Sequence, residues 1–243
     1  MERKHFLRSL IIGAVSAPVM MEACSKGNRV AASDSTSGTS GTGSSASATG
    51  CNVIPTETEG PFPTKTPSSY VRSDITNGRN GYALTIKFSI GNSNNNCAAI
   101  PGAIVDIWHC DAEGNYSEYG GGGMQSIDYQ SLHFLRGRQI TDTNGLVTFT
   151  SIFPGWYDGR ATHIHVHIYN SSGTSLKVTQ IAFPEVVGSA LLTVNGYARG
   201  MTGYTYNAKD NVFSDDTKGV EIATVTGGTN EGFDLSINIS VPV

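Results

Sequence analysis

Alternation of apolar and polar residues most constrains this sequence, because a period of two fits a β-strand that is buried on one face. From Phe233 to Val241 every second residue is apolar, and the residues between are Asp, Ser, Asn and Ser. The same reasoning predicts short strands, separated by turns, at residues 82–90, 103–108, 146–152, 163–169 and 177–183. A helix is expected only within residues 184–195. Short strands with frequent turns favour an all-β fold, a β-sandwich with long loops.

The composition agrees with a turn-rich globular protein that carries little charge. Charged residues make up 15% of the 243 residues and 29 residues are glycine, whereas about a quarter of an average chain is charged. The net charge of -4 indicates no basic surface for DNA or RNA. We therefore expect no nucleic-acid partner.

Residues 1–24 are typical of an export signal. Arg3 and Lys4 precede an apolar run that is too short to span a bilayer comfortably. The pair is similar to a twin-arginine signal with lysine in the second place. Cys24 is a candidate for lipidation, which would tether the protein to a membrane, and an uncleaved anchor helix is an alternative that Pro18 disfavours. We expect an exported protein that is periplasmic, extracellular or lipid-anchored.

Residues 25–50 are rich in Gly, Ser and Thr and are predicted to form a flexible tether. The folded domain is therefore expected over residues 51–243. Its three cysteines allow three pairings, and the sequence alone does not decide among them. Cys51 and Cys97 lie in polar surroundings and are able to pair in an exported protein, whereas Cys110 follows an apolar strand and is expected to be a buried thiol.

The segment HIHVHIY, residues 163–169, is the most informative for function. Side chains two residues apart on a strand share a face. His163, His165 and His167 are therefore predicted to point one way, and the apolar residues between them to point toward the core. A His-x-His pair on a strand can bind one metal ion through two imidazoles. The alternative is a polar strand face whose histidines only titrate.

Two tyrosines are predicted to lie near these histidines. Tyr116 follows a turn after the predicted strand 103–108, and Tyr157 follows the predicted strand 146–152. If these strand ends converge, two phenols and two imidazoles meet at one point. A free phenol has a pKa of about 10, so only a strongly acidic cation holds two phenolates near neutral pH. Ferric iron does so, and two phenolates with one hydroxide cancel its charge.

Four longer segments occur in order along the chain. They are TEGPFP (58–63), PGAIVDIWHCDAEGNYS (101–117), FLRGRQITDTNGLVTF (134–149) and FPGWYDGRATHIHVHI (153–168). Together they resemble the intradiol ring-cleavage dioxygenases, and most closely the exported branch similar to protocatechuate 3,4-dioxygenase. The resemblance extends from about Cys51 to Phe183, and the tail that follows carries no recognised motif. It implies a β-sandwich that holds a non-haem ferric iron, Fe(III).

The resemblance also implies an iron shell. By motif position, Tyr116 and His163 would be equatorial ligands and Tyr157 and His165 axial ligands, with a hydroxide or water completing the shell. A catechol that binds through both oxygens would displace the hydroxide and Tyr157. These two departing bases would accept the two phenolic protons.

Further roles follow from the same resemblance. Arg160 matches the family arginine that stabilises negative charge on the bound substrate, Gln180 matches a glutamine near it, and His167 has no family role as a ligand. The expected partners are a catechol and dioxygen, which would give a cis,cis-muconate-type diacid containing both oxygen atoms. The sequence leaves open whether the substrate is catechol, protocatechuate, hydroxyquinol or another catechol.

Two other functions would use the same residues. One is a non-catalytic prealbumin-like or carbohydrate-associated β-module, which would be colourless when purified. The other is a hydrolase that holds zinc through His163 and His165, although no third Cys or carboxylate ligand lies at a supportive spacing. The predicted tether stands where catechol dioxygenases carry a helical dimerisation region, so a helix-mediated dimer is not expected and the oligomeric state stays open.

Overall fold

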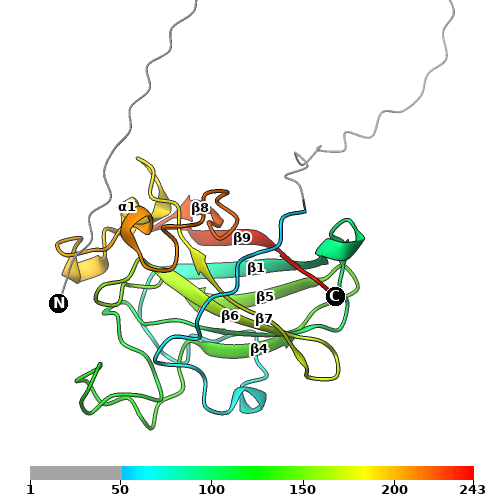
Figure 1. Ribbon diagram of the computed structural model, residues 1–243. Coiled ribbons are helices and arrows are strands. Elements are labelled where there is room, and N and C mark those ends of the chain that lie inside the picture. Colours follow the sequence, from blue (N-terminus) through cyan, green and yellow to red (C-terminus); the bar gives the residue numbers. More distant parts are fainter. Residues whose placement is uncertain (1–50) are drawn as a thin grey trace, which may run out of the picture. The chain divides into compact units, whose positions relative to one another are not determined.

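The computed structural model describes residues 51–243, which form two β-sheets that pack face to face (Figure 1). The all-β sandwich predicted from the alternating pattern is therefore confirmed. The predicted export signal, residues 1–24, and the predicted tether, residues 25–50, lie outside the described residues. Within residues 51–243, no helix has the length and apolar character needed to cross a membrane.

The first sheet contains the last strand of the described residues as one of its inner strands. Its strands are β1 (Ala83–Asn92), β2 (Ala98–Ala99), β5 (Leu146–Ile152), β8 (Thr224–Gly228) and β9 (Gly232–Val241). The strand order is β2-β1-β9-β8, and β5 also pairs with β1. β1 and β9 run parallel, with Leu84 opposite Phe233, whereas the other neighbours are antiparallel.

The second sheet carries the segment HIHVHIY. Its strands are β3 (Ile104–Trp108), β4 (Arg136–Ile140), β6 (His163–Tyr169) and β7 (Ser175–Ala182). They are antiparallel in the order β4-β3-β6-β7. β6 is therefore a central strand, and the register places His165 between Trp108 of β3 and Gln180 of β7.

The hydrophobic core lies between the two sheets. Ile86 and Phe88 of β1 are fully buried, as are Ile164 and Val166 of β6, and all four belong to one apolar cluster. The polar residues that alternate with them point away from this core, because successive side chains of a strand project to opposite faces. Burial of the apolar residues of each strand therefore determines which face of β6 carries the histidines.

Within residues 51–243, helices are few and short. The one α-helix of this part is α1 (Ala190–Val194), which begins after Ser189 and ends at Asn195 in the left-handed conformation. The Ser189 hydroxyl accepts from the Leu192 N–H. The 3-10 helices are η1 (Pro67–Ser69), η2 (Ser93–Asn95), η3 (Tyr197–Arg199) and η4 (Asn207–Lys209). The helix expected within residues 184–195 therefore exists but occupies only the second half of that range.

Three strands of the described part of the chain were not predicted: β2, which has only two residues, β4 and β8. β4 has the sequence RGRQI, which shows no apolar alternation because Arg136 and Arg138 face away from the core and are paired with carboxylates. β8 has the sequence TVTGG, which is mostly polar because it is an exposed edge strand. Neither β4 nor β8 carries the pattern on which the prediction relied.

The structure resolves the choice among the cysteines. Cys51 and Cys97 form a disulfide with a Cα–Cα distance of 5.6 Å, and Cys110 is a buried free thiol. The disulfide joins the start of the described chain to the loop between β1 and β2. Burial raises the pKa of the Cys110 thiol, so this residue is an inert packing group rather than a nucleophile.

Candidate metal centre

Strand β6 places two histidines side by side in a buried position. His163 and His165 are each 2% exposed, and their Nε2 atoms lie 3.1 Å apart. The indole of Trp108 on the neighbouring strand β3 stacks on the His165 ring with a centroid distance of 4.9 Å and an angle of 1°. These neighbours hold both imidazoles with their Nε2 atoms pointing toward a common place.

A loop after β3 brings a phenol to the same place. The hydroxyl oxygen of Tyr116 lies 3.2 Å from His163 Nε2 and 3.4 Å from His165 Nε2. The backbone of Tyr116 is held by Gln125, whose Oε1 accepts from the Tyr116 N–H at 2.6 Å and whose Nε2 donates to the Tyr116 carbonyl at 2.9 Å. Tyr116 itself is 1% exposed.

The spacing of these three donor atoms fits a shared metal ion. Ligand atoms at about 2.1 Å from one ion lie roughly 3.0–3.4 Å from one another in octahedral or tetrahedral geometry. The three separations of 3.1, 3.2 and 3.4 Å fall in that range. Two imidazole nitrogens and one phenol oxygen form a donor set that suits a hard, strongly acidic cation better than zinc.

The protonation states of the three groups also fit. The Nδ1 of His163 donates to the Ala161 carbonyl at 2.6 Å, which leaves the Nε2 lone pair free for a metal. Burial lowers the pKa of His163 to about 3 and lowers that of His165 well below its usual value. Burial raises the pKa of the Tyr116 phenol well above its usual value. All three groups are therefore neutral at pH 7, and only a cation at their centre would remove the phenol proton.

Tyr157 lies next to this cluster but does not join it. Its ring is 6.1 Å from the Tyr116 ring, edge to face, whereas its hydroxyl donates to the Met124 carbonyl at 3.0 Å. Burial, followed by the nearby charge of Asp158, raises the pKa of Tyr157. Three of the four donors expected from the sequence therefore touch one another, and the fourth is at the edge of the cluster with its hydroxyl on the loop that follows Gly120–Gly123.

Arg160 and Gln180 are brought together beside the histidines. The Nη2 of Arg160 donates to Gln180 Oε1 at 2.8 Å, and the Nε2 of Gln180 donates to the Thr58 carbonyl at 2.8 Å. Gln180 is the residue opposite His165 in the pairing of β6 with β7. The positive charge of Arg160 is the second cause, after burial, of the lowered pKa of His163.

His167 stands apart from the cluster. Its Nδ1 lies 3.0 Å from a carboxylate oxygen of Glu59, and its Nε2 lies 2.8 Å from the Ser175 hydroxyl. Its ring stacks on Tyr169 with a centroid distance of 4.0 Å. The third histidine of the strand therefore attaches the segment around Glu59 to the sheet.

Phe62 and Asp210 are among the contributors to the site that were not predicted, as are Trp108 and Gln125. Phe62 stacks on Tyr116 at 4.8 Å and meets Tyr157 edge to face at 5.3 Å, which gives the cluster an aromatic wall. Asp210 accepts hydrogen bonds from Arg160. Phe62 lay within a recognised segment, but a lone phenylalanine gives no signal of its contacts. Asp210 lies in the tail that carried no recognised motif, so that part of the chain does contribute to the site.

The zinc alternative lacks ordinary ligands. Among residues 51–243, no three or more His, Cys, Asp or Glu side chains gather so that they could hold a metal ion. The third donor beside His163 and His165 is the phenol of Tyr116. The donor set therefore differs from that of the zinc hydrolases.

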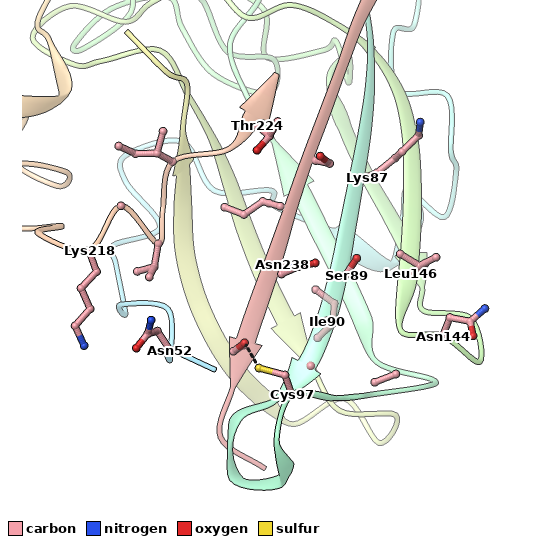
Figure 2. A pocket seen from close by; sticks show the side chains of 18 residues that line it. Asn52, Lys87, Ser89, Ile90, Cys97, Asn144, Leu146, Lys218, Thr224 and Asn238 are labelled. Carbon is pink, nitrogen blue, oxygen red and sulfur yellow. Dashed lines mark hydrogen bonds between the residues drawn. The ribbon is translucent and has the colours of Figure 1, made fainter. Parts of the chain in front are cut away.

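A pocket of about 800 Å³ lies elsewhere, on the first sheet (Figure 2). Lys87 and Ser89 of β1 and Asn238 of β9 are among its lining residues, with Asn52 and Lys218 at one end. None of the predicted iron ligands lines it. The pocket is therefore separate from the cluster on the second sheet.

Comparisons with known proteins agree with this geometry. A family model described as "Dioxygenase" matches residues 69–192, which is about half of the chain. The chlorocatechol 1,2-dioxygenase of Rhodococcus opacus is 29% identical over 103 residues, which are 35% of this chain and 37% of that protein. The chain thus matches little more than a third of the length of this curated relative.

Solved structures extend the similarity over most of the described residues. An intradiol ring-cleavage dioxygenase from Tetranychus urticae is 29% identical, with a TM-score of 0.67 over 79% of this chain and 95% of that chain. The dioxygenase domain of a carbohydrate-binding fusion protein from Streptomyces sp. SirexAA-E is 23% identical, with a TM-score of 0.55 over 79% and 99% of the two chains, and supports the fold alone. On the family match, the shared fold and the aligned segments, the chain belongs to the intradiol ring-cleavage dioxygenase family.

Proposed function

We propose that this protein is a non-haem iron(III) dioxygenase that opens the ring of a catechol between its two hydroxylated carbons. The observation that carries the proposal is the buried contact of Tyr116 with His163 and His165, because these neutral donors surround one point and fit a strongly acidic cation. Catechol and dioxygen together contain every atom of a cis,cis-muconate-type diacid, so no external reductant is needed.

In this proposal Tyr116, His163 and His165 hold the iron, with Tyr157 as a fourth ligand once its hydroxyl leaves the Met124 carbonyl. Bound ferric iron supplies a Lewis acid that draws electron density from a coordinated catechol. Tyr157 is the half-buried member of the set, so it is the ligand best placed to leave and to accept a proton from the substrate.

Other side chains of the site bind and orient the ring. Phe62 stacks on Tyr116 and meets Tyr157 edge to face, so these three rings would form an apolar wall beside a bound aromatic substrate. Arg160 lies beside the histidines and supplies a fixed positive charge for the negative charge that develops on the substrate.

We also propose that the protein works after export. The Cys51–Cys97 disulfide supports this, because structural disulfides persist mainly in oxidising compartments. The signal-like residues 1–24 are the expected means of export. Lipidation at Cys24 would attach the exported protein to a membrane.

The test begins with the purified full-length protein. We expect about one iron per chain, a visible absorption band from phenolate bound to Fe(III), and dioxygen uptake with at least one member of a panel containing catechol, protocatechuate and hydroxyquinol. Tyr116→Phe should abolish the band and the uptake, because it removes the buried oxygen donor.

Tyr119→Phe is the matched control. Tyr119 lies in the same wall, packs on Phe62, and its hydroxyl donates to the Pro63 carbonyl rather than to the cluster. This variant should keep both the iron and the band. A colourless, iron-free wild-type protein that consumes no dioxygen after loading with iron would contradict the proposed function.

A further inference from the structure

Asp210 is a buried carboxylate that holds two parts of the site at once. It is 0% exposed. Its Oδ2 accepts from Arg160 Nε at 2.9 Å and from the Ala161 N–H at 2.6 Å, while its Oδ1 accepts from the Val212 N–H at 2.8 Å. Burial acts to raise the pKa of Asp210, but these hydrogen bonds outweigh it and the pKa is lowered. The carboxylate is therefore charged at neutral pH.

These contacts determine which nitrogen of Arg160 remains available. The Nε is bound by Asp210 and the Nη2 by Gln180. Within residues 51–243, Nη1 of Arg160 has no hydrogen-bond partner. The Nη1 atom is also not fully buried. Because a guanidinium is planar and rigid, two fixed nitrogens also determine the direction of the third.

The same carboxylate connects Arg160 to the metal cluster. Asp210 holds the Ala161 N–H, and the Ala161 carbonyl accepts from His163 Nδ1 at 2.6 Å. Asp210 therefore holds the guanidinium of Arg160 directly. It holds the imidazole of His163 indirectly, through the backbone of Ala161. A shift of the anchor would move the charge of Arg160 relative to the donor atoms of the cluster.

We propose that Asp210 is a positioning residue that aims Nη1 of Arg160 at the bound substrate. The inference rests on the proposed function, since it assigns Asp210 a part in the same reaction. Partners that orient the groups of a metal site typically contribute about 10- to 100-fold to activity or metal affinity. Asp210 acts through Arg160, so its contribution should disappear when Arg160 is absent.

Asp216 provides a matched control in the same tail. Its two carboxylate oxygens accept from the Val220 N–H at 3.1 Å and the Glu221 N–H at 2.8 Å. It therefore caps backbone groups as Asp210 does, but no hydrogen bond or ion pair joins it to Arg160. Asp216→Asn therefore measures how kcat changes when a carboxylate of the same tail is lost but the guanidinium of Arg160 stays in place.

The experiment is a double-mutant cycle on the iron-loaded protein, with wild type, Asp210→Asn, Arg160→Ala, the double variant and Asp216→Asn. We expect Asp210→Asn to lower kcat about 10- to 100-fold, to change KM less than about threefold and to keep the iron. In the Arg160→Ala background the same change should lower kcat less than about twofold. Asp216→Asn should match wild type in kcat.

A second readout does not depend on activity. The rate at which phenylglyoxal modifies Arg160, followed by peptide mass spectrometry, should rise in Asp210→Asn and stay unchanged in Asp216→Asn. Only the former releases the guanidinium from its anchor, so that its Nη1 and Nη2 atoms become more accessible to the dicarbonyl. If Asp210→Asn does not fold, Asp210→Glu takes its place in both measurements, since it keeps the charge but displaces the guanidinium.

Three results would overturn the inference: equal losses of kcat in both backgrounds, a loss of kcat that follows loss of iron, or an unchanged rate of Arg160 modification. Each of these results can be distinguished from failure of the proposed function. If the proposed function fails, the wild-type protein itself consumes no dioxygen with any catechol. The rates of Arg160 modification then still test the role of Asp210 as an anchor.

Discussion

Gly60 lies where a side chain does not fit. Its φ is +67°, a conformation that glycine adopts easily, and a Cβ there would lie 3.0 Å from Cε1 of His165. The His165 ring has little room to yield, because its other side stacks on Trp108. The segment around Gly60 therefore forms one wall of the cluster made by Tyr116, His163 and His165.

We expect Gly60→Ala to destabilise the protein and to weaken iron retention. The positive φ alone costs about 1 kcal/mol when alanine replaces glycine, and the contact with His165 adds to it. Gly78→Ala is the control, because Gly78 has a φ of +78° and nothing within 4 Å of a Cβ. Thermal melting and iron content of the two variants provide the comparison. Equal effects would mean that the contact with His165 is unimportant.

Three side chains that gather in the cluster could be predicted to lie together from the sequence, but the contacts that support them could not. His163 and His165 follow from a period of two on one strand, and the phenol of Tyr116 follows from its place after a neighbouring strand. The hydrogen bond of Tyr157 to Met124 depends on how two loops meet. The contact of Asp210 with Arg160 joins residues 50 positions apart, and no local pattern encodes it.

At the scale of elements, the segment before β8 is attached to the end of β7. The Ala182 N–H donates to the Glu221 carbonyl at 2.8 Å, and the Ala223 N–H donates to the Ala182 carbonyl at 3.0 Å. Glu221 is 0% exposed, and neither of its carboxylate oxygens has a hydrogen-bond partner within the described residues. Burial raises the pKa of Glu221 to about 8.

The raised pKa of Glu221 predicts a pH-dependent stability. Its pKa is higher in the folded protein than in the unfolded chain, so its contribution is fully present below about pH 4.5 and is lost as the pH rises through about 8. Each pH unit in that window costs up to about 1.4 kcal/mol. Glu221→Gln should therefore raise the melting temperature more at pH 8.5 than at pH 5.

Glu231→Gln is the control for this prediction. Glu231 is exposed in the turn between β8 and β9, so its neutral variant should melt like wild type at both pH values. The same gain in melting temperature for Glu221→Gln at pH 5 and pH 8.5 would show that burial of the charge is not the cause.

Elements with an apolar face were predicted well and those without one were missed. β5 and β6 have the predicted bounds, because burial of alternate residues against the opposite sheet determines both the pattern and the strand. β4 was missed because its arginines lie on the outer face, where Arg138 pairs with Asp106 at 2.6 Å. Because charged residues of different strands pair with each other, β4 by itself does not show the alternation of apolar and polar residues that predicts a strand.

At the scale of the whole molecule, the Cys51–Cys97 disulfide closes a separation of 46 residues. A crosslink of that span stabilises a fold by about 4 kcal/mol through the entropy of the unfolded chain. The double variant Cys51→Ser/Cys97→Ser should therefore unfold at a lower urea concentration than wild type. On the proposed function it should still bind iron, because His163 and His165 lie on β6 and Tyr116 on the loop after β3, whereas the disulfide holds a loop of the first sheet.

Reductant provides the control for the disulfide. It should lower the urea midpoint of wild type to that of the double variant and leave the double variant unchanged. Cys110 is a free thiol in both proteins, so its chemistry cancels in the comparison. If wild type keeps its midpoint after complete reduction, the crosslink contributes nothing to stability.

The sandwich could be predicted from the number and spacing of short strands, but the strand order could not. The parallel pairing of Leu84 with Phe233 joins residues far apart in the chain. The sequence of either strand does not indicate which other strand it pairs with. Register between distant strands is decided by how both apolar faces fit one shared core.

The position of β9 between β1 and β8 has a consequence for biosynthesis. While a ribosome is still making the preceding residues, β1 lacks its parallel neighbour and the first sheet stays incomplete. Folding is thus delayed until β9 has emerged, because a pairing of such long range forms late. A nascent chain stalled before Gly232 should expose Phe88 and Ile86 to chaperones, whereas a chain whose β9 has emerged can pair β9 with β1.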